Sequence, residues 1–218
     1  PQFAILDPAY TFSVPKDQTI YGIVDSMSHV LEHYFHEADH TEFQDRMCEG
    51  LLLTIMEAAP DVLKNPENYD ARATLMYGST MALNGMLNMG YRGDWATHNL
   101  EHAVSAVHDI PHGGGLAILF PRWMRHYVHE DVQRFRKLAT RVFNVNTTGL
   151  SDLEVAMKGI ETLEAFWESI GAPTHLATYQ IDDSTLNIIV DRAMRQGDFG
   201  NFATVTASDA EAIFKAAL

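Results

Sequence analysis

Four histidines lie within fifteen consecutive residues of this 218-residue chain, in the stretch THNLEHAVSAVHDIPHGGG. His98 and His102 are four positions apart, so in a helix their side chains lie about one turn apart on the same face. Ile110 precedes Pro111, which disfavours helical backbone at Ile110 and cannot extend the helical hydrogen-bond pattern. His112 follows, and we expect the three glycines after it to form a turn. The stretch therefore offers imidazoles from a helix and from the turn behind it.

The surrounding sequence predicts an all-α fold. From residue 16 onward, apolar side chains recur at helical spacing, and we find no internal repeat or long linker. Ser208 and Glu211 have the spacing of a capping box at the start of the last helix. The expected helices cover residues 18–35, 41–59, 70–89, 95–108, 116–128, 131–143, 151–170, 184–196 and 208–217.

The first fifteen residues differ from the rest of the chain. The runs FAIL and YTFSV within residues 3–14 favour one or two short strands. Two strands alone bury little apolar surface and need a partner sheet. We therefore expect residues 1–15 to be a strand segment that joins an absent N-terminal domain, and residues 16–218 to form one helical metal-binding and substrate domain.

Composition excludes several classes of function. A formal net charge of −14 argues against nucleic acid or an anionic membrane as a partner, since both require clustered lysine and arginine. No apolar run approaches the roughly 20 residues that span a bilayer. The single cysteine, Cys48, cannot form an internal disulfide, and no signal peptide precedes the first helix, so the default location is the cytoplasm. The oligomeric state stays open, a homo-oligomer included.

Two polar helix faces indicate a metal site. Asp25 and His29 share one face of the helix 18–35, and His98 and His102 share one face of the helix 95–108. Neither face carries the lysine and arginine expected of a solvent-exposed surface. The simpler interpretation is two wet surface helices, but the absence of cations favours two faces that meet across a cavity.

A divalent ion would fill that cavity. Asp25, His29, His98 and His112 together would offer three imidazoles and one carboxylate. Such a set suits Zn²⁺ or Fe²⁺ and is too rich in nitrogen for Mg²⁺ or Ca²⁺. An ion held in this way polarises a substrate oxygen, which is Lewis-acid chemistry.

Two segments resemble the signature segments of the iron-containing, group III alcohol dehydrogenases. They are GIVDSMSHVLEHY at residues 22–34 and HNLEHAVSAVHDIPHGGGLAILFP at residues 98–121. A third segment, ARATLMYGSTMALNG at residues 71–85, is similar to the butanol dehydrogenase and NADPH-dependent aldehyde reductase branch of that family. The resemblance implies an enzyme that interconverts primary alcohols and aldehydes by hydride transfer with NADP or NAD.

The resemblance also assigns roles to residues. It implies that Asp25, His29, His98 and His112 bind the metal, Fe²⁺ or Zn²⁺. His102 resembles the histidine that lies near the substrate oxygen and passes a proton to solvent; alternatively, it orients His98 or a metal-bound water.

The chain departs from the family in one large respect, because the nucleotide-binding domain with its glycine-rich phosphate turn is missing. The glycines at 113–115 follow a helix and not a strand, so we expect them to pack closely near the metal instead of cradling phosphates. This places the nicotinamide mainly on the absent N-terminal domain, and we expect the 218 residues alone to be inactive.

Two other functions fit parts of the pattern. An all-helical phosphohydrolase of the H…HD…D type would use His98 or His102 together with His108 and Asp109. The chain could instead be a non-catalytic metal-binding domain. His33 and His36, which neither alternative uses, are expected at the rim of the cleft.

Overall fold

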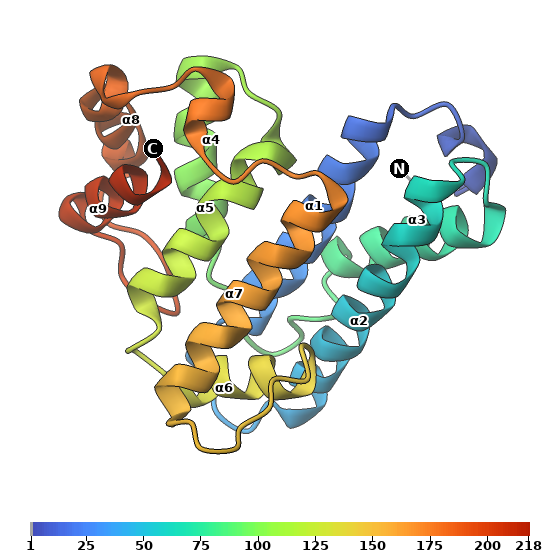
Figure 1. Cartoon of the computed structure of the whole chain (residues 1–218), viewed down its shortest axis with the longest axis horizontal. Coiled ribbons are helices and arrows are strands. Elements are labelled where there is room, and N and C mark those ends of the chain that lie inside the picture. Colours follow the sequence, from blue (N-terminus) through green and yellow to red (C-terminus); the bar gives the residue numbers. More distant parts are fainter. Residues whose placement is uncertain (1) are drawn as a thin grey trace.

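The computed structural model describes residues 2–218 and confirms the all-α fold (Figure 1). Within these residues the chain forms nine α-helices and four short 3-10 helices, and its strand-like pairing is confined to one isolated bridge between Phe199 and Val205. No helix of this part of the chain is long and apolar enough to cross a membrane. The elements are η1 (Pro8–Thr11), α1 (Lys16–Tyr34), α2 (Glu42–Lys64), α3 (Tyr69–Leu83), α4 (Ala96–His108), α5 (His112–Tyr127), α6 (Val132–Arg141), α7 (Asp152–Ile170), η2 (Leu176–Tyr179), η3 (Asp183–Thr185), α8 (Leu186–Ala193), η4 (Met194–Gln196) and α9 (Ala207–Ala217).

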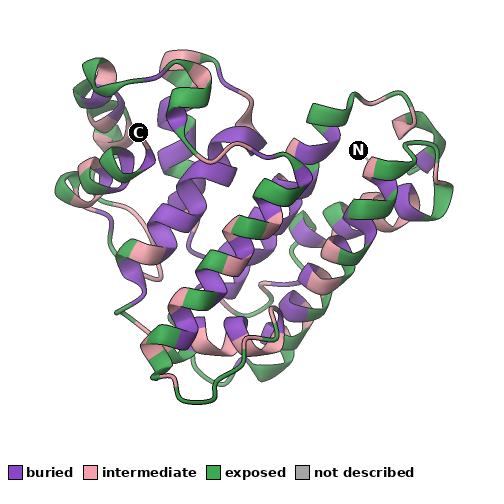
Figure 2. Cartoon of the chain, viewed as in Figure 1, coloured by how far each residue is buried: buried purple, intermediate pink, exposed green. Residues whose placement is uncertain are grey.

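Helix α5 lies at the centre of the fold. Its sequence is apolar on nearly every side, and thirteen of its sixteen residues are buried, as expected for a helix that other helices surround (Figure 2). It packs against α1, α4, α7 and α9. Trp123 of α5 contacts the ring of Phe35 at the end of α1, with ring centroids 5.1 Å apart. Most of the core is therefore organised around the helix that follows the histidine-rich stretch.

The other helices are arranged on the two sides of this centre. Helix α1 runs between α5 and the pair α2 and α3, while α8 and α9 pack on the opposite side against α4 and α5 (Figure 1). Helices α6 and α7 pack against each other, and α7 also packs against α5. This arrangement brings α1 and α4, which carry the two polar faces, against the same end of α5.

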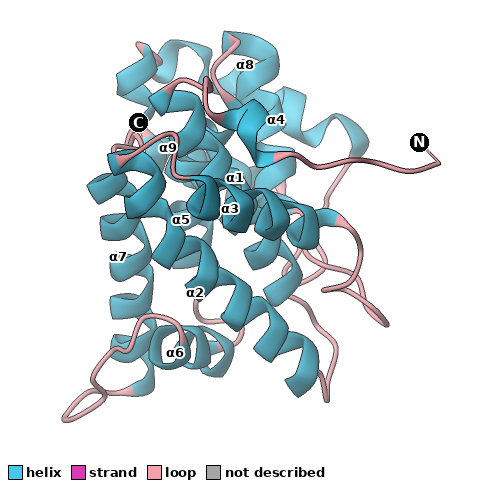
Figure 3. Ribbon diagram, turned by 90° about the vertical axis from the view of Figure 1, so that its right-hand side faces the viewer, coloured by secondary structure: helices cyan, strands magenta, loops and turns pink. Residues whose placement is uncertain are grey.

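The prediction of N-terminal strands is wrong. Residues 2–14 contain no strand, and the segment before η1 projects from the helices without a pairing partner (Figure 3). The side chain of Asp7 accepts a hydrogen bond from the backbone N–H of Ala9 at 3.0 Å, and Pro8 suits the first position of a helical turn. Strands need a partner sheet, and residues 2–218 supply none, so these local signals decide the backbone.

Three predicted helix boundaries also differ from the structure. Helix α3 ends at Leu83 and not at residue 89, because Gly85 adopts a φ of 85°, which ends a right-handed helix. Helix α2 continues through Pro60 to Lys64, since its last turns are held by burial against the core. The segment 184–196 is a shorter α-helix flanked by two 3-10 turns.

The N-cap of the last helix is also different. Helix α9 is capped by a box formed by Thr206 and Asp209, and not by Ser208 and Glu211. Two residue pairs at the required spacing overlap here, and the structure uses the one that begins two residues earlier.

The crossing of α6 and α7 gives a test of this packing. A Cβ atom at Gly159 of α7 would lie 2.5 Å from the Cβ of Ala139 in α6, whereas a Cβ at Gly50 of α2 meets no atom within 4 Å. We expect Gly159→Ala to lower the free energy of unfolding by about 1–3 kcal/mol through overpacking. The matched change Gly50→Ala should raise it by about 0.5–1 kcal/mol. Urea denaturation measures both, and equal effects of the two substitutions would contradict this close helix contact.

Candidate metal centre

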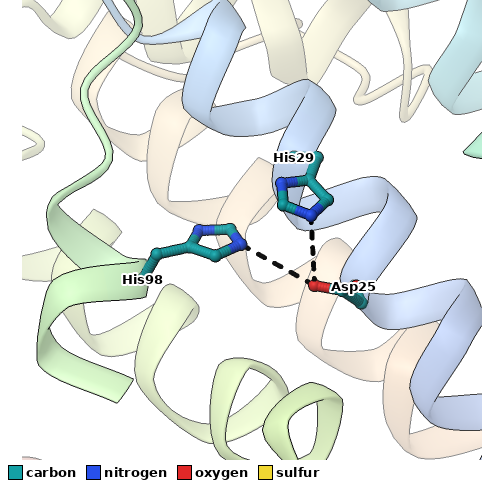
Figure 4. Close-up of side chains that lie close together, drawn as sticks. All are labelled: Asp25, His29 and His98. Atoms are coloured by element: carbon teal, nitrogen blue, oxygen red, sulfur yellow. Dashed lines mark ion pairs between the residues drawn. The ribbon is translucent and has the colours of Figure 1, made fainter. Parts of the chain in front are cut away.

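Helix α1 carries two of the expected site residues. Asp25 and His29 are one helical turn apart, and the Nε2 atom of His29 lies 3.6 Å from the Oδ1 atom of Asp25 (Figure 4). The apolar face of the same helix is formed by fully buried residues such as Val24, Met27 and Val30, which fix the rotation of α1 about its axis. The polar face is therefore turned toward α4 and the start of α5.

His98 and His112 approach the same carboxylate oxygen from two other helices. The Nε2 atom of His98, in the first turn of α4, lies 3.7 Å from Asp25 Oδ1 (Figure 4). The Nε2 atom of His112, the first residue of α5, lies 3.4 Å from it. The structure thus brings together all four residues, from three helices, that the sequence analysis assigns to a metal.

Several polar atoms of this cluster have no hydrogen-bond partner. Asp25 Oδ1, His98 Nε2 and His29 Nδ1 are buried, and no atom of residues 2–218 forms a hydrogen bond with them. A buried polar atom without a partner costs roughly 1–3 kcal/mol. The donor atoms of Asp25, His29 and His98 lie within 4.8 Å of one another, a spacing compatible with one shared cation.

Two buried glutamates contact the outward-facing nitrogens of the cluster. Glu32 of α1 is 1% exposed, and its Oε1 atom lies 2.9 Å from Nδ1 of His98. Glu101 of α4 is fully buried and contacts Nδ1 of His112 through its Oε2 atom. Neither glutamate is among the site residues predicted from the sequence. A signal was present, because Glu32 and Glu101 each lie three residues after a histidine of the cluster, His29 and His98, and so share its helix face.

The three glycines form the first turn of α5, so the expected turn after His112 is wrong. The carbonyl of Pro111 accepts hydrogen bonds from the N–H groups of Gly114 and Gly115 at 2.9 and 3.0 Å. A Cβ at Gly113 would overlap the backbone of Tyr21 in α1, and one at Gly115 would lie 2.6 Å from the side chain of Glu101. The glycines therefore permit close packing of α5 against α1 and α4, as the sequence suggests.

Trp95 forms one wall of the cluster. Its indole lies with its centroid 5.5 Å from the ring of His29, 5.2 Å from that of His98 and 5.2 Å from that of His33. Its backbone has a φ of 63°, a left-handed conformation that a bulky side chain rarely adopts. Such a conformation persists only where the surrounding packing holds it.

His102 lies beside the cluster and not in contact with Asp25. Its ring centroid is 5.2 Å from that of His112 and 6.3 Å from that of His98. The side chain is exposed and lines a cleft of about 410 Å³ between α4 and the segment 192–199. Within residues 2–218 it forms no hydrogen bond with His98 or His112.

The residues of the phosphohydrolase hypothesis do not assemble. The Nε2 atom of His108 is 2.8 Å from the hydroxyl of Thr185, and Asp109 adopts a left-handed conformation as the C-cap of α4. Neither residue is among those that approach Asp25 or the donor groups around it. That hypothesis is not supported.

The expectation for His33 and His36 is also wrong, because both side chains are buried and not at a rim. His36 lies between Thr41 and Asp45, with its Nε2 atom 3.4 Å from a carboxylate oxygen of Asp45. His33 packs edge-on against Trp95. Both residues therefore hold α1 to its neighbours.

The charges of the cluster shift the pKa values of its members. Burial raises the pKa of Asp25, but the His112 and His98 imidazoles outweigh burial and hold it well below its usual range. Burial lowers the pKa of His29 to about 4. At His112, burial acts in the same direction, but Asp25 and Glu101 outweigh it and raise the pKa to about 9. At neutral pH, Asp25 is thus ionised and His29 is neutral.

The sequence matches the family described as "Fe-containing alcohol dehydrogenase family, C-terminal" over residues 19–218. The chain belongs to this family. The resemblance found in the sequence motifs is therefore confirmed, and so is the helical fold that it implies.

Individual relatives of the chain support this family assignment. A probable NADH-dependent butanol dehydrogenase of Bacillus subtilis is 57% identical over the whole chain, and the NADPH-dependent aldehyde reductase YqhD of Escherichia coli is 37% identical. The crystal structure of NADH-dependent butanol dehydrogenase A from Thermotoga maritima superposes on the whole chain with a TM-score of 0.93 at 36% identity. The chain spans 56% of the length of each of these three proteins.

The charge pattern of the cluster gives a prediction about pH. In the presence of a chelator, His112 should titrate with a pKa of about 9, above its ordinary value of 6.5. Because the folded-state pKa is raised, the charged imidazole stabilises the fold at pH below about 6.5, and this contribution is lost as pH rises through about 9. NMR titration of the ring carbons, with His112→Gln to assign the signal, measures the value. A midpoint at or below 6.5 would contradict the ion pairs.

Proposed function

We propose that this chain is the metal-binding half of an NAD(P)-dependent alcohol dehydrogenase that interconverts primary alcohols, of about the size of butanol, and aldehydes. The approach of three imidazole Nε2 atoms, those of His29, His98 and His112, to Oδ1 of Asp25 carries this proposal, because these are the residues that match the family motif. The relatives are named as butanol dehydrogenases and an aldehyde reductase, which supports the choice of substrate.

The donor set fits a divalent ion. Three imidazoles and one carboxylate suit Fe²⁺ or Zn²⁺, and the unpartnered Asp25 Oδ1 and His98 Nε2 would each gain a partner. His29 is neutral at physiological pH and can donate its lone pair, while Asp25 is ionised and offsets part of the cation's charge. When bound, such an ion polarises the oxygen of the alcohol or aldehyde.

His102 would move the proton of the reaction. Oxidation of an alcohol sends a hydride from carbon to the nicotinamide and releases the hydroxyl proton. Burial, together with the nearby charge of His112, lowers the pKa of His102, so its imidazole is neutral at pH 7 and can accept that proton. Its exposure in the cleft gives a route to solvent, and its lack of hydrogen bonds to His98 and His112 favours this role over an orienting one.

The nicotinamide would come from the part of the relatives that lies outside the match. We propose that residues 1–15 join such a nucleotide-binding region to the helical domain at 16–218. The side chains of Phe3 and Ile5 are 79% and 86% exposed in the projecting N-terminal segment, which supports a neighbour that covers them (Figure 3).

Metal binding tests the site directly. The purified chain should bind one Fe²⁺ or Zn²⁺ per molecule, as measured by elemental analysis and calorimetry. Asp25→Ala and His98→Ala should each abolish this binding, because they remove a donor atom from the centre of the cluster. His102→Ala should change the affinity far less, because its ring lies beside the cluster.

His126→Ala is a matched control, since this histidine lies at the far end of α5 and pairs with Asp209 of α9. Unchanged metal content in Asp25→Ala would reject the proposed site. Equal loss of metal from His98→Ala and His102→Ala would show that the relay histidine is misassigned.

Activity requires the nucleotide-binding region as well. Joined to the N-terminal region of the Bacillus subtilis relative and loaded with Fe²⁺ or Zn²⁺, the chain should reduce butyraldehyde with NADH. In this chimera, His102→Ala should lower kcat by roughly 10²–10⁴-fold, the usual contribution of general acid–base catalysis.

The 218-residue chain alone should show no steady oxidation of NADH, since none of its described side chains can replace a hydride carrier. Turnover by the chain alone would reject this division of the enzyme. A folded, metal-loaded chimera without aldehyde reduction would reject the proposed activity and leave metal binding by the chain as its function.

A further inference from the structure

Glu32 and Glu101 stand apart from the other buried glutamate of the described chain. Glu49 is 3% exposed and forms ion pairs with Arg46 and Arg141. Glu32 and Glu101 are at least as buried, yet neither forms an ion pair with lysine or arginine among residues 2–218; their charged partners are the histidines His98 and His112. Burying a carboxylate without a cation is costly unless hydrogen bonds compensate for the lost hydration.

We propose that Glu32 and Glu101 are positioning residues that fix the orientation and tautomer of His98 and His112, and thereby set the affinity of the site for its metal. This inference rests on the proposed function. Each imidazole donates its Nδ1 hydrogen to the carboxylate. When the imidazole is neutral, as metal binding requires, its Nε2 lone pair is on the side that faces Asp25.

Glu32 is held in place by more than one contact. Its Oε1 atom accepts hydrogen bonds from the backbone N–H of His98 at 3.1 Å and from the hydroxyl of Thr97, in addition to the ring contact at 2.9 Å. The carboxylate therefore caps the first turn of α4 and orients the ring that projects from it. Because Glu32 and Asp25 are both on α1, this one helix provides the carboxylates that contact both ring nitrogens of His98.

Glu101 occupies a niche that two other residues create. The hydroxyl of Ser105, one turn along α4, donates a hydrogen bond to its Oε1 atom. Gly115 of α5 leaves the space for its side chain, since a Cβ there would lie 2.6 Å from Oε1 and 2.7 Å from Cγ. The missing side chain at Gly115 thus lets Glu101 reach His112 across the contact between α4 and α5.

His29 provides an internal contrast. Its Nδ1 atom is buried and has no hydrogen-bond partner among the described residues. Its ring is held by stacking on His98, with centroids 4.5 Å apart, and by contact with Trp95. Two of the three imidazoles are therefore oriented by carboxylates and the third by aromatic packing.

Direct ligation by Glu101 is the competing interpretation. Glu101, His102 and His112 have donor atoms within 4.8 Å of one another. However, both oxygens of Glu101 are engaged, one by Ser105 and one by Nδ1 of His112. The Nε2 atom of His112 is directed at Asp25, 3.4 Å away, on the other side of the ring. Glu101 therefore acts through the imidazole.

Zinc affinity of the whole chain tests the proposal. We expect Glu32→Gln and Glu101→Gln each to bind Zn²⁺ about 10–100-fold more weakly than the wild type, with one ion still bound, as measured by calorimetry in competition with a chelator. Glu49→Gln is the matched control, a buried glutamate paired with arginines, and should leave the affinity unchanged. Unchanged affinity in both glutamine variants would overturn the proposal.

Loss of Zn²⁺ binding as complete as in Asp25→Ala would also overturn it, because it would identify the glutamate as a ligand. If the wild type binds neither Zn²⁺ nor Fe²⁺, the proposed function itself is wrong, and this inference fails with it. Failure of this inference and failure of the proposed function are distinguishable, because only failure of the proposed function removes metal binding from the wild type.

The tautomers of His98 and His112 give a second readout, and its measurement on the wild type does not depend on whether the variants fold. In ¹⁵N NMR spectra of the Zn²⁺-loaded wild type, His98 and His112 should both carry hydrogen on Nδ1. In the glutamine variants the Nδ1 hydrogen of the affected histidine should exchange faster with solvent. Hydrogen on Nε2 of either histidine in the loaded wild type would reject the proposal.

Discussion

The close approach of α5 to α1 and α4 is the constraint on which the site depends. His112 is the first residue of α5, so its distance from Asp25 is set by how near the start of that helix lies to α1. Side chains at residues 113 and 115 would overlap Tyr21 and Glu101. Glycine at these positions costs helix stability, roughly 0.5–1 kcal/mol each relative to alanine. Burial of most of α5 offsets this cost, so the central helix of the core also places the fourth donor.

The electrostatics of the site follow from which charges are absent. The chain carries a net charge of −14, and the carboxylates of the cluster, Asp25, Glu32 and Glu101, have histidines as their charged partners. Elsewhere in the described chain, buried acids such as Glu49 and Asp45 are neutralised by arginine. A permanent cation beside the imidazoles would compete with a metal. Histidine can instead give up its proton and offer a lone pair, so the same residues can neutralise the carboxylates and form the proposed metal site.

Helix geometry explains what the sequence could predict. The spacing of Asp25 and His29 on one helix, and of His98 and His102 on another, follows from 3.6 residues per turn, and burial of the opposite faces turns these residues inward. Spacing along one helix cannot predict the contact of His112 with Asp25, because it depends on how two helices pack. The position of His112 in the turn behind the helix and the family motif both suggested it. The strand prediction failed at residues 3–14 because an apolar run does not specify its partner.

The glutamates show a different limit. Glu32 and Glu101 share helix faces with the histidines, so helical spacing predicts that they lie near the site. Whether a carboxylate meets a ring nitrogen or solvent depends on side-chain packing. Here it depends on the space at Gly115 and on the hydroxyl of Thr97, and helical spacing does not reveal the contact of either residue with a glutamate. The first turn of α5 is a similar case, because three glycines after a proline favour a turn until burial against α1 and α4 makes the helix more stable.

Exposure differs between His98 and His102, which have different tasks in the proposed function. A residue that binds a metal must be held in one orientation, and His98 with its partner Glu32 is almost fully buried. A residue that passes protons to water must reach solvent, and His102 is exposed at the cleft beside α8. On the proposed function, the hydride acceptor comes from outside the described side chains, because none of them can accept a hydride.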